Sequence, residues 1–205
     1  VLTIAGDIDM AETKTMIEKY FSTIPASDKP VYRPDIMEPT QTAEIRDTVY
    51  DNVQLPALFI GYRNPAQGTD DYYAVSMLNN VLGGGQSARI PKALVDEQKV
   101  AVQAVSFPSE MEDPGLGAII LIANMGIDPA QLETALDAEI EKVKNELISE
   151  REFQKVRNQI ESSFINNIAS VSGIAENLAV YEVHYGDANL INTELERYLS
   201  VTRED

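Results

Sequence analysis

Apolar and polar residues follow two spacings along this chain, one typical of strands and one typical of helices. Residues 43–49 alternate between apolar and polar positions, which predicts a half-buried strand. Residues 57–62 form a continuous apolar run, which predicts a strand covered on both faces. Residues 100–107 and 116–125 predict two strands that pair across a turn-rich connection, and residues 1–8 predict one more. We therefore expect a mostly antiparallel sheet.

Capping residues mark where the helices begin. Ser149 with Glu152, and Asp9 with Glu12, have the spacing of a capping box, and Asp128 precedes a proline at the first helical position. A proline at position 25 and the glycines at 83–85 are expected to end two of the helices. The predicted helix starts are Asp9, Thr69, Ser87, Asp128, Ser149, Ser172 and Asp187.

A spacing of three to four residues between apolar positions predicts which side of each helix is buried. The expected core positions of the first three long helices are Met10, Ile17, Phe21, Val75, Leu78, Leu82, Leu132, Leu136, Ile140, Val143 and Leu147. Those of the later helices are Phe153, Val156, Ile160, Phe164, Ile168, Ile174, Leu178, Leu190, Ile191, Leu195 and Leu199.

This mixture of elements predicts the α+β class. We expect a two-layer sandwich in which helices pack on one face of a mostly antiparallel sheet. A length of 205 residues fits one domain, so we expect residues 1–205 to form a single domain. Residues 1–6 begin inside an apolar run, and residues 202–205 have the pattern of a helix N-cap. For that reason we expect the chain to be a fragment of a larger, multi-domain protein.

The charge of the chain argues against two classes of partner. Sixteen basic and 33 acidic residues give a formal net charge of −17, which repels nucleic acid and anionic lipid. No apolar stretch approaches the roughly 18 residues of a membrane span. We therefore expect no nucleic-acid partner and no membrane span.

The segment Gly83–Ala88, GGGQSA, formally satisfies the G-x-G-x-x-A pattern of dinucleotide-binding folds. That pattern binds a pyrophosphate only when a strand precedes the glycines. Here the preceding residues have helical spacing, so the glycines are better explained as the end of a helix, where a positive φ is needed. We expect no cofactor-binding residues.

His184 is the only histidine, and the chain has no cysteine. A zinc site needs three or four protein ligands, so His184 would have to recruit distant carboxylates. We therefore expect no metal ligands, and we interpret His184 as an ordinary, partly buried side chain.

Carboxylates gather at two places in the sequence. Glu110, Glu112 and Asp113 lie in one loop, and the only apolar residue among them is a methionine. In such polar surroundings both carboxylates of any pair would stay ionised, whereas acid–base catalysis needs surroundings that shift their pKa values apart. Asp70 and Asp71 lie in a first helical turn and suit the helix dipole. His184 is the only histidine that could serve as the base of a serine or threonine nucleophile, and the sequence has no G-x-S-x-G motif. We expect no catalytic residues in this chain.

Several segments, taken in order, resemble the insulinase/pitrilysin-type zinc metallopeptidases. Residues 82–105, LGGGQSARIPKALVDEQKVAVQAV, resemble the family's "GG-x-S-S-R-L … L-V-x-E-K-x-L-A" pattern. Residues 1–9 are similar to its "v-v-G-D-v-d" segment, and residues 18–25 to its "i-e-k-y-F … I-P" segment. Residues 54–62 are similar to "q-p-a-l-x-i-g-y", and residues 71–74 follow at the family's spacing. The resemblance covers nearly the whole chain.

The resemblance implies a domain that lacks the family's metal site. Members bind zinc through H-x-x-E-H in their first domain, and this chain has no such motif. In many members the closing half supplies an arginine and a tyrosine, seven residues apart, that hold the substrate. Here Val95 and Val102 stand where that pair would be. The chain therefore resembles the second, non-metal-binding domain, and a degenerate fourth domain is the alternative.

We therefore expect a non-catalytic structural and substrate-chamber domain of a bacterial zinc metalloendopeptidase. Its expected partners are the metal-bearing first domain, the second half of the parent peptidase and a peptide substrate. Zinc is expected in the parent protein only, and a periplasmic or other extracytoplasmic location is favoured. The alternative is a domain of a metal-free homologue that acts as an assembly or peptide-binding scaffold.

Overall fold

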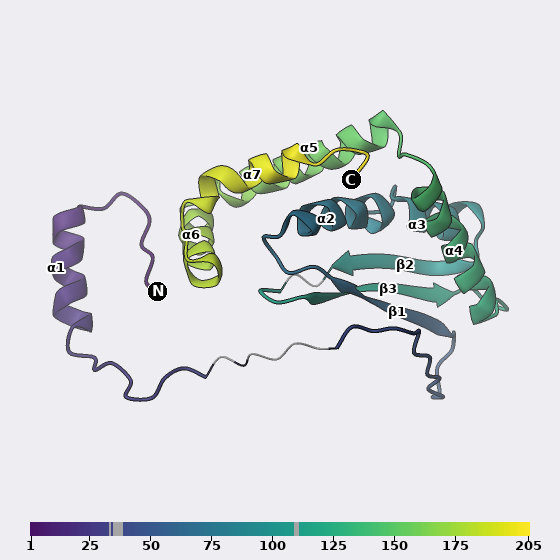
Figure 1. Cartoon of the computed structure of the whole chain (residues 1–205), viewed down its shortest axis with the longest axis horizontal. Coiled ribbons are helices and arrows are strands. Elements are labelled where there is room, and N and C mark those ends of the chain that lie inside the picture. The colour runs from purple at the N-terminus through teal and green to yellow at the C-terminus, as the bar shows by residue number, and fades with distance from the viewer. Residues whose placement is uncertain (33, 35–38, 109–110) are drawn as a thin grey trace. The chain divides into compact units, whose positions relative to one another are not determined.

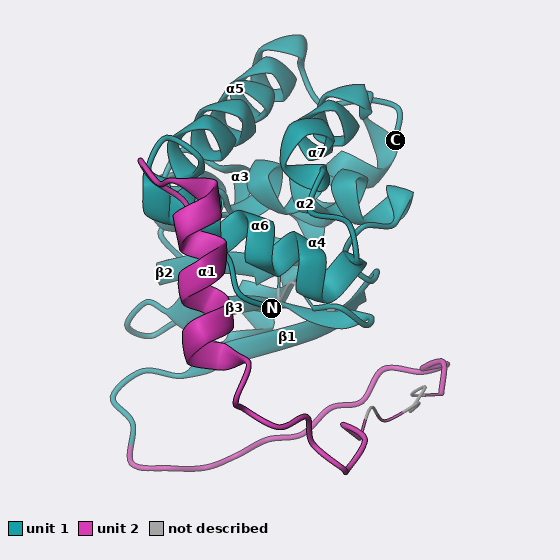
Figure 2. Cartoon of the chain, turned by 90° about the vertical axis from the view of Figure 1, so that its left-hand side faces the viewer, with its two compact units in different colours: residues 1–4, 53–205 teal, residues 5–52 magenta. Residues whose placement is uncertain are grey.

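A computed structural model describes residues 1–32, 34, 39–108 and 111–205. The chain forms two compact units, one of residues 1–4 with 53–205 and one of residues 5–52 (Figure 2). The larger unit contains the sheet and most of the helices. The prediction of a single domain over residues 1–205 stays a prediction.

The larger unit is built on a three-stranded antiparallel sheet (Figure 1). Its strands are β1 (Ala57–Asn64), β2 (Ala101–Pro108) and β3 (Gly115–Ala123), in the spatial order β1-β3-β2. The central strand β3 pairs Ile120 with Phe59 of β1 and with Val105 of β2. The strands predicted at 57–62, 100–107 and 116–125 are confirmed, with small differences at their ends.

One face of the sheet carries the hydrophobic core. The helices α2 (Asp70–Gly83), α3 (Arg89–Pro91) and α4 (Pro129–Asn145), and the π-helix at Lys92–Glu97, supply the apolar side chains that cover it. Alternate residues of β3 are fully buried on this face while their neighbours are not, as expected for a sheet with one buried side. The most buried large side chains are Ile90, Leu94, Ile119, Leu121, Leu132 and Leu136.

Residues 57–62 were predicted to form a strand covered on both faces. Leu58, Ile60 and Tyr62 of β1 pack against the core, which confirms one of these faces. That the other face is also covered stays a prediction. The fold belongs to the predicted α+β class.

The remaining helices of the larger unit are α5 (Glu150–Asn167), α6 (Val171–Tyr185) and α7 (Leu190–Ser200). The capping box of Ser149 and Glu152 begins α5, and Asp128 with Gln131 forms one at α4, so both predicted starts are confirmed. The two later starts differ from the prediction. Ser170, not the predicted Ser172, caps α6, because its Oγ accepts a hydrogen bond from Gly173 N–H. The predicted Asp187 accepts from Asn189 N–H in a turn that precedes α7.

The smaller unit contains one helix, α1 (Met10–Phe21). Asp9 caps it as predicted, accepting hydrogen bonds from the N–H groups of Ala11 and Glu12. The helix ends at Phe21, before Pro25. No residue of α1 is buried; Met10 and Phe21, two of its predicted core positions, are 63% and 51% exposed.

The strands predicted at residues 1–8 and 43–49 are wrong for this structure. Both segments are extended or irregular and pair with no strand among the described residues. Ile45 and Val49, whose alternation suggested a buried face, are 82% and 85% exposed. An alternation of apolar and polar residues shows that one face of a strand could be buried, but a strand also requires a neighbouring strand for its backbone hydrogen bonds.

Among the helices of the described residues, none combines the length and the apolar composition of a membrane-spanning helix.

Candidate functional site

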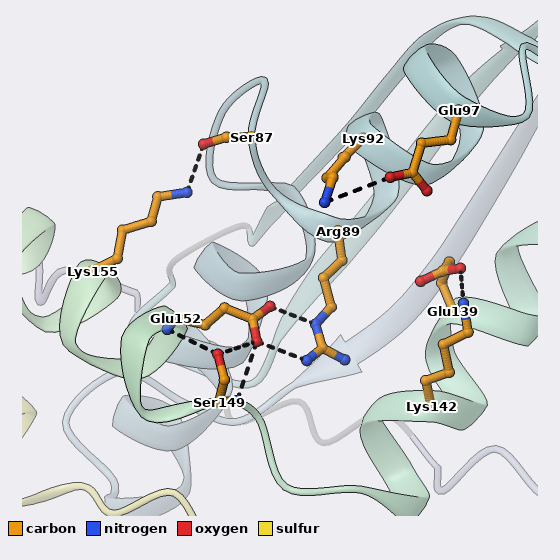
Figure 3. Close-up of polar contacts among 9 residues, drawn as sticks. All are labelled: Ser87, Arg89, Lys92, Glu97, Glu139, Lys142, Ser149, Glu152 and Lys155. Carbon is orange, nitrogen blue, oxygen red and sulfur yellow. Dashed lines mark hydrogen bonds and ion pairs between the residues drawn. The ribbon is translucent and has the colours of Figure 1, made fainter.

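The densest group of polar contacts surrounds Arg89, near the start of the segment that follows the glycine triplet (Figure 3). Arg89 Nε donates to Glu152 Oε1 at 2.9 Å, and Arg89 Nη2 donates to Glu152 Oε2 at 3.0 Å. This two-bond geometry is the strongest arrangement between a guanidinium and a carboxylate. It joins α3 to the first turn of α5.

The capping box of α5 holds Glu152 in place for this contact. Ser149 donates to Glu152 Oε2 from its backbone N–H at 3.1 Å and from its hydroxyl at 2.8 Å. The hydrogen bonds from Arg89 first, and then those from Ser149, lower the pKa of Glu152 from 4.5 to about 2. The same contact raises the pKa of Arg89. Glu152 is therefore an ionised carboxylate with its oxygens already occupied, which leaves it unsuited to act as a base.

The other charged groups around Arg89 line a cavity of about 800 Å³. Lys142 Nζ lies 2.5 Å from Glu139 Oε1, and Lys92 Nζ lies 3.5 Å from Glu97 Oε1. Lys155 Nζ donates to Ser87 Oγ at 2.7 Å (Figure 3). Three of these cations, Arg89, Lys92 and Lys142, are paired with carboxylates, and Lys155 is paired with a hydroxyl. The contacts of Arg89 and Lys155 join α5 to the segment around α3, whereas those of Lys92 and Lys142 each lie within a single helix.

The ion pair of Arg89 with Glu152 predicts a loss of stability in acid. The carboxyl has a lower pKa in the folded chain than in the unfolded one, so its contribution is complete above 4.5 and is lost as the pH falls through about 2. Because the Glu152 side chain is 37% exposed, solvent screens the pair, and we expect a contribution of about 1 kcal/mol.

Urea unfolding of the wild type and of Glu152→Gln measures this contribution. The wild type is expected to be the more stable protein near neutral pH, and the gap between the two should narrow as the pH falls toward about 2. Glu161→Gln, an exposed position on the same helix, serves as the control and should show no such gap. A gap that does not change with pH would contradict the prediction.

The glycine triplet forms a helix end, as the sequence indicates. Gly83 is the last residue of α2, and a Cβ at that position would lie 2.4 Å from Ser106 Cβ. Gly85 has φ +102°, a conformation that favours glycine. Because a helix and not a strand precedes these glycines, the dinucleotide interpretation lacks its structural requirement.

His184 lies on α6, with its Nδ1 3.6 Å from Glu112 Oε2. Both side chains are nearly half-exposed. Two groups are fewer than a zinc site needs, and among the described residues no three histidine, cysteine or carboxylate side chains are placed to hold a metal ion. The prediction that the chain has no metal ligands stays a prediction.

The other predicted positions lie apart from the Arg89 cluster. Glu110 lies outside the described residues, whereas Asp113 is exposed in its loop. Asp70 Oδ1, in the first turn of α2, lies 3.9 Å from Arg197 Nη2. Val102 is 47% exposed on β2, and Val95 packs against the core.

A buried carboxylate among tyrosines was not predicted from the sequence. Glu194 of α7 is 6% exposed and accepts hydrogen bonds from the hydroxyls of Tyr73 and Tyr181. Burial first, and then Glu194, raise the pKa of both tyrosines. Arg197 Nη1 also donates a hydrogen bond to Tyr73 Oη at 3.1 Å, so Arg197 belongs to the same group. This group connects α2, α6 and α7 and, like the Arg89 cluster, ties helices together.

Comparison with known proteins identifies related sequences over the whole chain. The zinc protease PqqE of Helicobacter pylori is 28% identical over 185 residues, which cover 89% of this chain and 42% of that protein. The probable inactive metalloprotease YmfF of Bacillus subtilis is 24% identical over 212 residues, which cover 100% of this chain and 47% of that protein. The chain thus spans less than half the length of these relatives.

Solved structures share the fold. A protease from Helicobacter pylori matches 98% of this chain and 49% of its own, with a TM-score of 0.84 and 26% identity. The periplasmic protease PqqL from Escherichia coli matches 97% of this chain and 22% of its own, with a TM-score of 0.72 and 18% identity. Residues 1–160 match the model of the peptidase M16 inactive domain. The resemblance to the insulinase-type peptidases is confirmed, and the chain belongs to the peptidase M16 inactive domain family.

Proposed function

We propose that this chain acts as a non-catalytic domain of a longer zinc metalloendopeptidase. In that role it supports the metal-bearing first domain and forms part of the wall of the chamber in which the peptide is cut. Its partners are that first domain, the second half of the peptidase and the peptide substrate.

One structural observation supports this role directly. The polar contacts around Arg89 and Glu152 are satisfied within the chain and join α3 to α5. Catalytic groups need perturbed pKa values and an open path to a substrate. The carboxylate with the largest fall in pKa, Glu152, is instead held between Arg89 and Ser149. Polar residues arranged in this way give rigidity to a supporting domain.

The zinc of the parent protein belongs to residues outside this chain. When bound there, zinc supplies a Lewis acid that activates a water molecule for peptide hydrolysis. The residues of this chain contribute the shape and the rigidity of the surroundings. A bacterial, extracytoplasmic location is part of the proposal, supported by the likeness to a periplasmic protease.

A second candidate function is that of a scaffold in a metal-free homologue. It is supported by the full-length match of this chain to YmfF, which is described as a probable inactive metalloprotease. The two candidates differ in the parent protein and not in this chain. An H-x-x-E-H motif in the parent's first domain supports the peptidase, and its absence supports the scaffold.

Zinc analysis and peptide cleavage test the proposed role. We expect the purified chain to hold far less than one zinc per molecule after dialysis and to leave an unstructured peptide mixture intact. The parent protein should hold zinc in its first domain and cleave the same peptides until a chelator is added. Stoichiometric zinc together with chelator-sensitive cleavage by the isolated chain would overturn the proposal.

A further inference from the structure

Residues 201–205 have the contacts of a helix start. Thr202 N–H donates to Asp205 Oδ2 at 2.9 Å, and Thr202 Oγ1 donates to the same oxygen at 2.8 Å. Ser149 makes the same two contacts with Glu152, at 3.1 Å and 2.8 Å, and α5 begins there. A carboxylate that accepts from the N–H group three residues before it is one half of a capping box, which marks the beginning of a helix.

The residue before this start is also of the type that a helix start uses. At α5, Ile148 precedes the cap, and Phe153 is the fourth helical residue; both pack in the same hydrophobic cluster. This pairing is a hydrophobic staple, which fixes the direction in which the chain enters a helix. Val201 holds the corresponding place before Thr202 and packs against the same cluster. The residue that follows Asp205 would take the place of Phe153 in the staple.

These residues lie at the wall of a cavity. The cavity has a volume of about 530 Å³ and lies between α2, the end of α4, the start of α5 and residues 201–205. Its apolar lining includes Met77, Val81 and Phe153, which belong to the cluster that Val201 contacts. All of the lining residues belong to the larger unit. A helix that begins at Thr202 therefore starts at this cavity.

Two leucines in the lining favour a helix as the occupant. Helical spacing predicts Leu78 and Leu147 to be core positions, yet they are 40% and 55% exposed. Both line the cavity, one from α2 and the other from the segment after α4. An apolar helix side in the cavity would cover both leucines and would give them the burial that their spacing predicts.

We infer that a helix begins at Thr202 in the parent protein and that its apolar side fills this cavity. The inference rests on the proposed function, because it requires the chain to continue after Asp205 in a longer protein. The lengths of the relatives agree, since this chain spans 42% of PqqE and 47% of YmfF. The first residue after Asp205, and those three and four positions further on, are expected to be apolar. Charged residues at these three positions in the parent sequence would contradict the inference.

Thiol labelling of the parent protein measures whether this helix covers the cavity. The chain has no cysteine, so Leu78→Cys and Leu147→Cys each introduce one reporter thiol once the parent's other cysteines are replaced by serine. Ile165→Cys on α5, 51% exposed and outside the cavity lining, is the control thiol. Each thiol is placed in two forms of the parent. One form keeps the natural sequence, and the other has proline at the third and seventh positions after Asp205, which breaks the helix but keeps its apolar positions.

We expect the thiols at 78 and 147 to react with a maleimide dye at least about tenfold faster in the proline form, because a covered site reacts only when it opens. The thiol at 165 should react at rates within about twofold of each other in the two forms. Far-UV circular dichroism confirms that both forms are folded.

A milder variant decides the question if the proline form does not fold. Thr202→Ala combined with Asp205→Ala removes the cap and should speed the reaction of the thiols at 78 and 147 about fivefold. Glu204→Ala changes an acidic residue of the same turn that has no part in the cap contacts, and it should change these rates less than about twofold.

Rates at 78 and 147 that respond to neither variant would overturn the inference. If they are slow in every form, the cavity has another occupant, such as residues 5–52; if they are slow only at high protein concentration, the occupant is a second copy. If they are fast in every form, no segment of the parent fills the cavity.

The same parent sample separates this inference from the proposed function. If the parent lacks zinc and cleaves no peptide but its thiols respond to the prolines, the peptidase role fails and the helix contact stands. If the parent holds zinc and cleaves peptides while the thiols do not respond, the helix contact fails and the peptidase role stands.

Discussion

Glu194→Ala is expected to lower the free energy of unfolding by about 3 kcal/mol, because it removes a buried carboxylate from its hydrogen-bond donors. Glu194 is 6% exposed and accepts hydrogen bonds from Tyr73 and Tyr181. Alanine would leave both hydroxyls without this acceptor and would open a cavity between α2, α6 and α7. Urea unfolding followed by far-UV circular dichroism measures the loss.

Two further variants identify the source of this loss. Glu196→Ala changes an exposed glutamate of the same helix and should cost less than about 0.5 kcal/mol. Glu194→Gln keeps an oxygen that can accept from a tyrosine hydroxyl, so its cost should lie between those of the two alanine variants. If Glu194→Ala were as stable as the wild type, the tyrosine group would not be what joins these helices.

Local signals predicted the helices well because the groups that start a helix are close in sequence. Ser149 and Glu152 are three residues apart, and the structure shows the capping box that their spacing predicts. Glu194 had no such signal. Its burial depends on Tyr73 and Tyr181, which come from two other helices, so nothing in the sequence around Glu194 indicates it.

Some strands were predicted correctly and others wrongly, because a local pattern does not show whether a pairing strand is present. Residues 116–125 were placed correctly because their apolar run is long and their partners lie nearby in the sheet. Residues 43–49 show a strand-like alternation but form no strand, because alternation says nothing of whether a partner is present. Residues 57–62 form the predicted strand, and Leu58, Ile60 and Tyr62 pack one of its faces against the core.

The candidate site shows the same limit. The sequence identified the glycine triplet as a helix end and pointed to His184 as an isolated imidazole. It did not indicate that Arg89 and Glu152 meet, since these residues lie 63 positions apart. Only the resemblance to the "GG-x-S-S-R" pattern drew attention to the arginine, and that pattern does not name its partner.

Leu136→Ala is expected to cost about 3–4 kcal/mol, whereas Leu147→Ala should cost less than about 1 kcal/mol. The same helical spacing predicted both leucines to be buried. In the structure Leu136 lies on the side of α4 that packs on the sheet and is 0% exposed. Leu147 lies beyond the end of α4 and is 55% exposed.

The difference between these two variants tests whether the helix layer sits on the sheet as described. Removing the Leu136 side chain leaves a cavity that the surrounding core closes only in part, whereas Leu147 loses little contact. Urea unfolding of both variants, under the same conditions as the wild type, gives the comparison. Equal losses would mean that Leu147 packs as tightly as Leu136, and that the end of α4 continues into the core instead of leaving it.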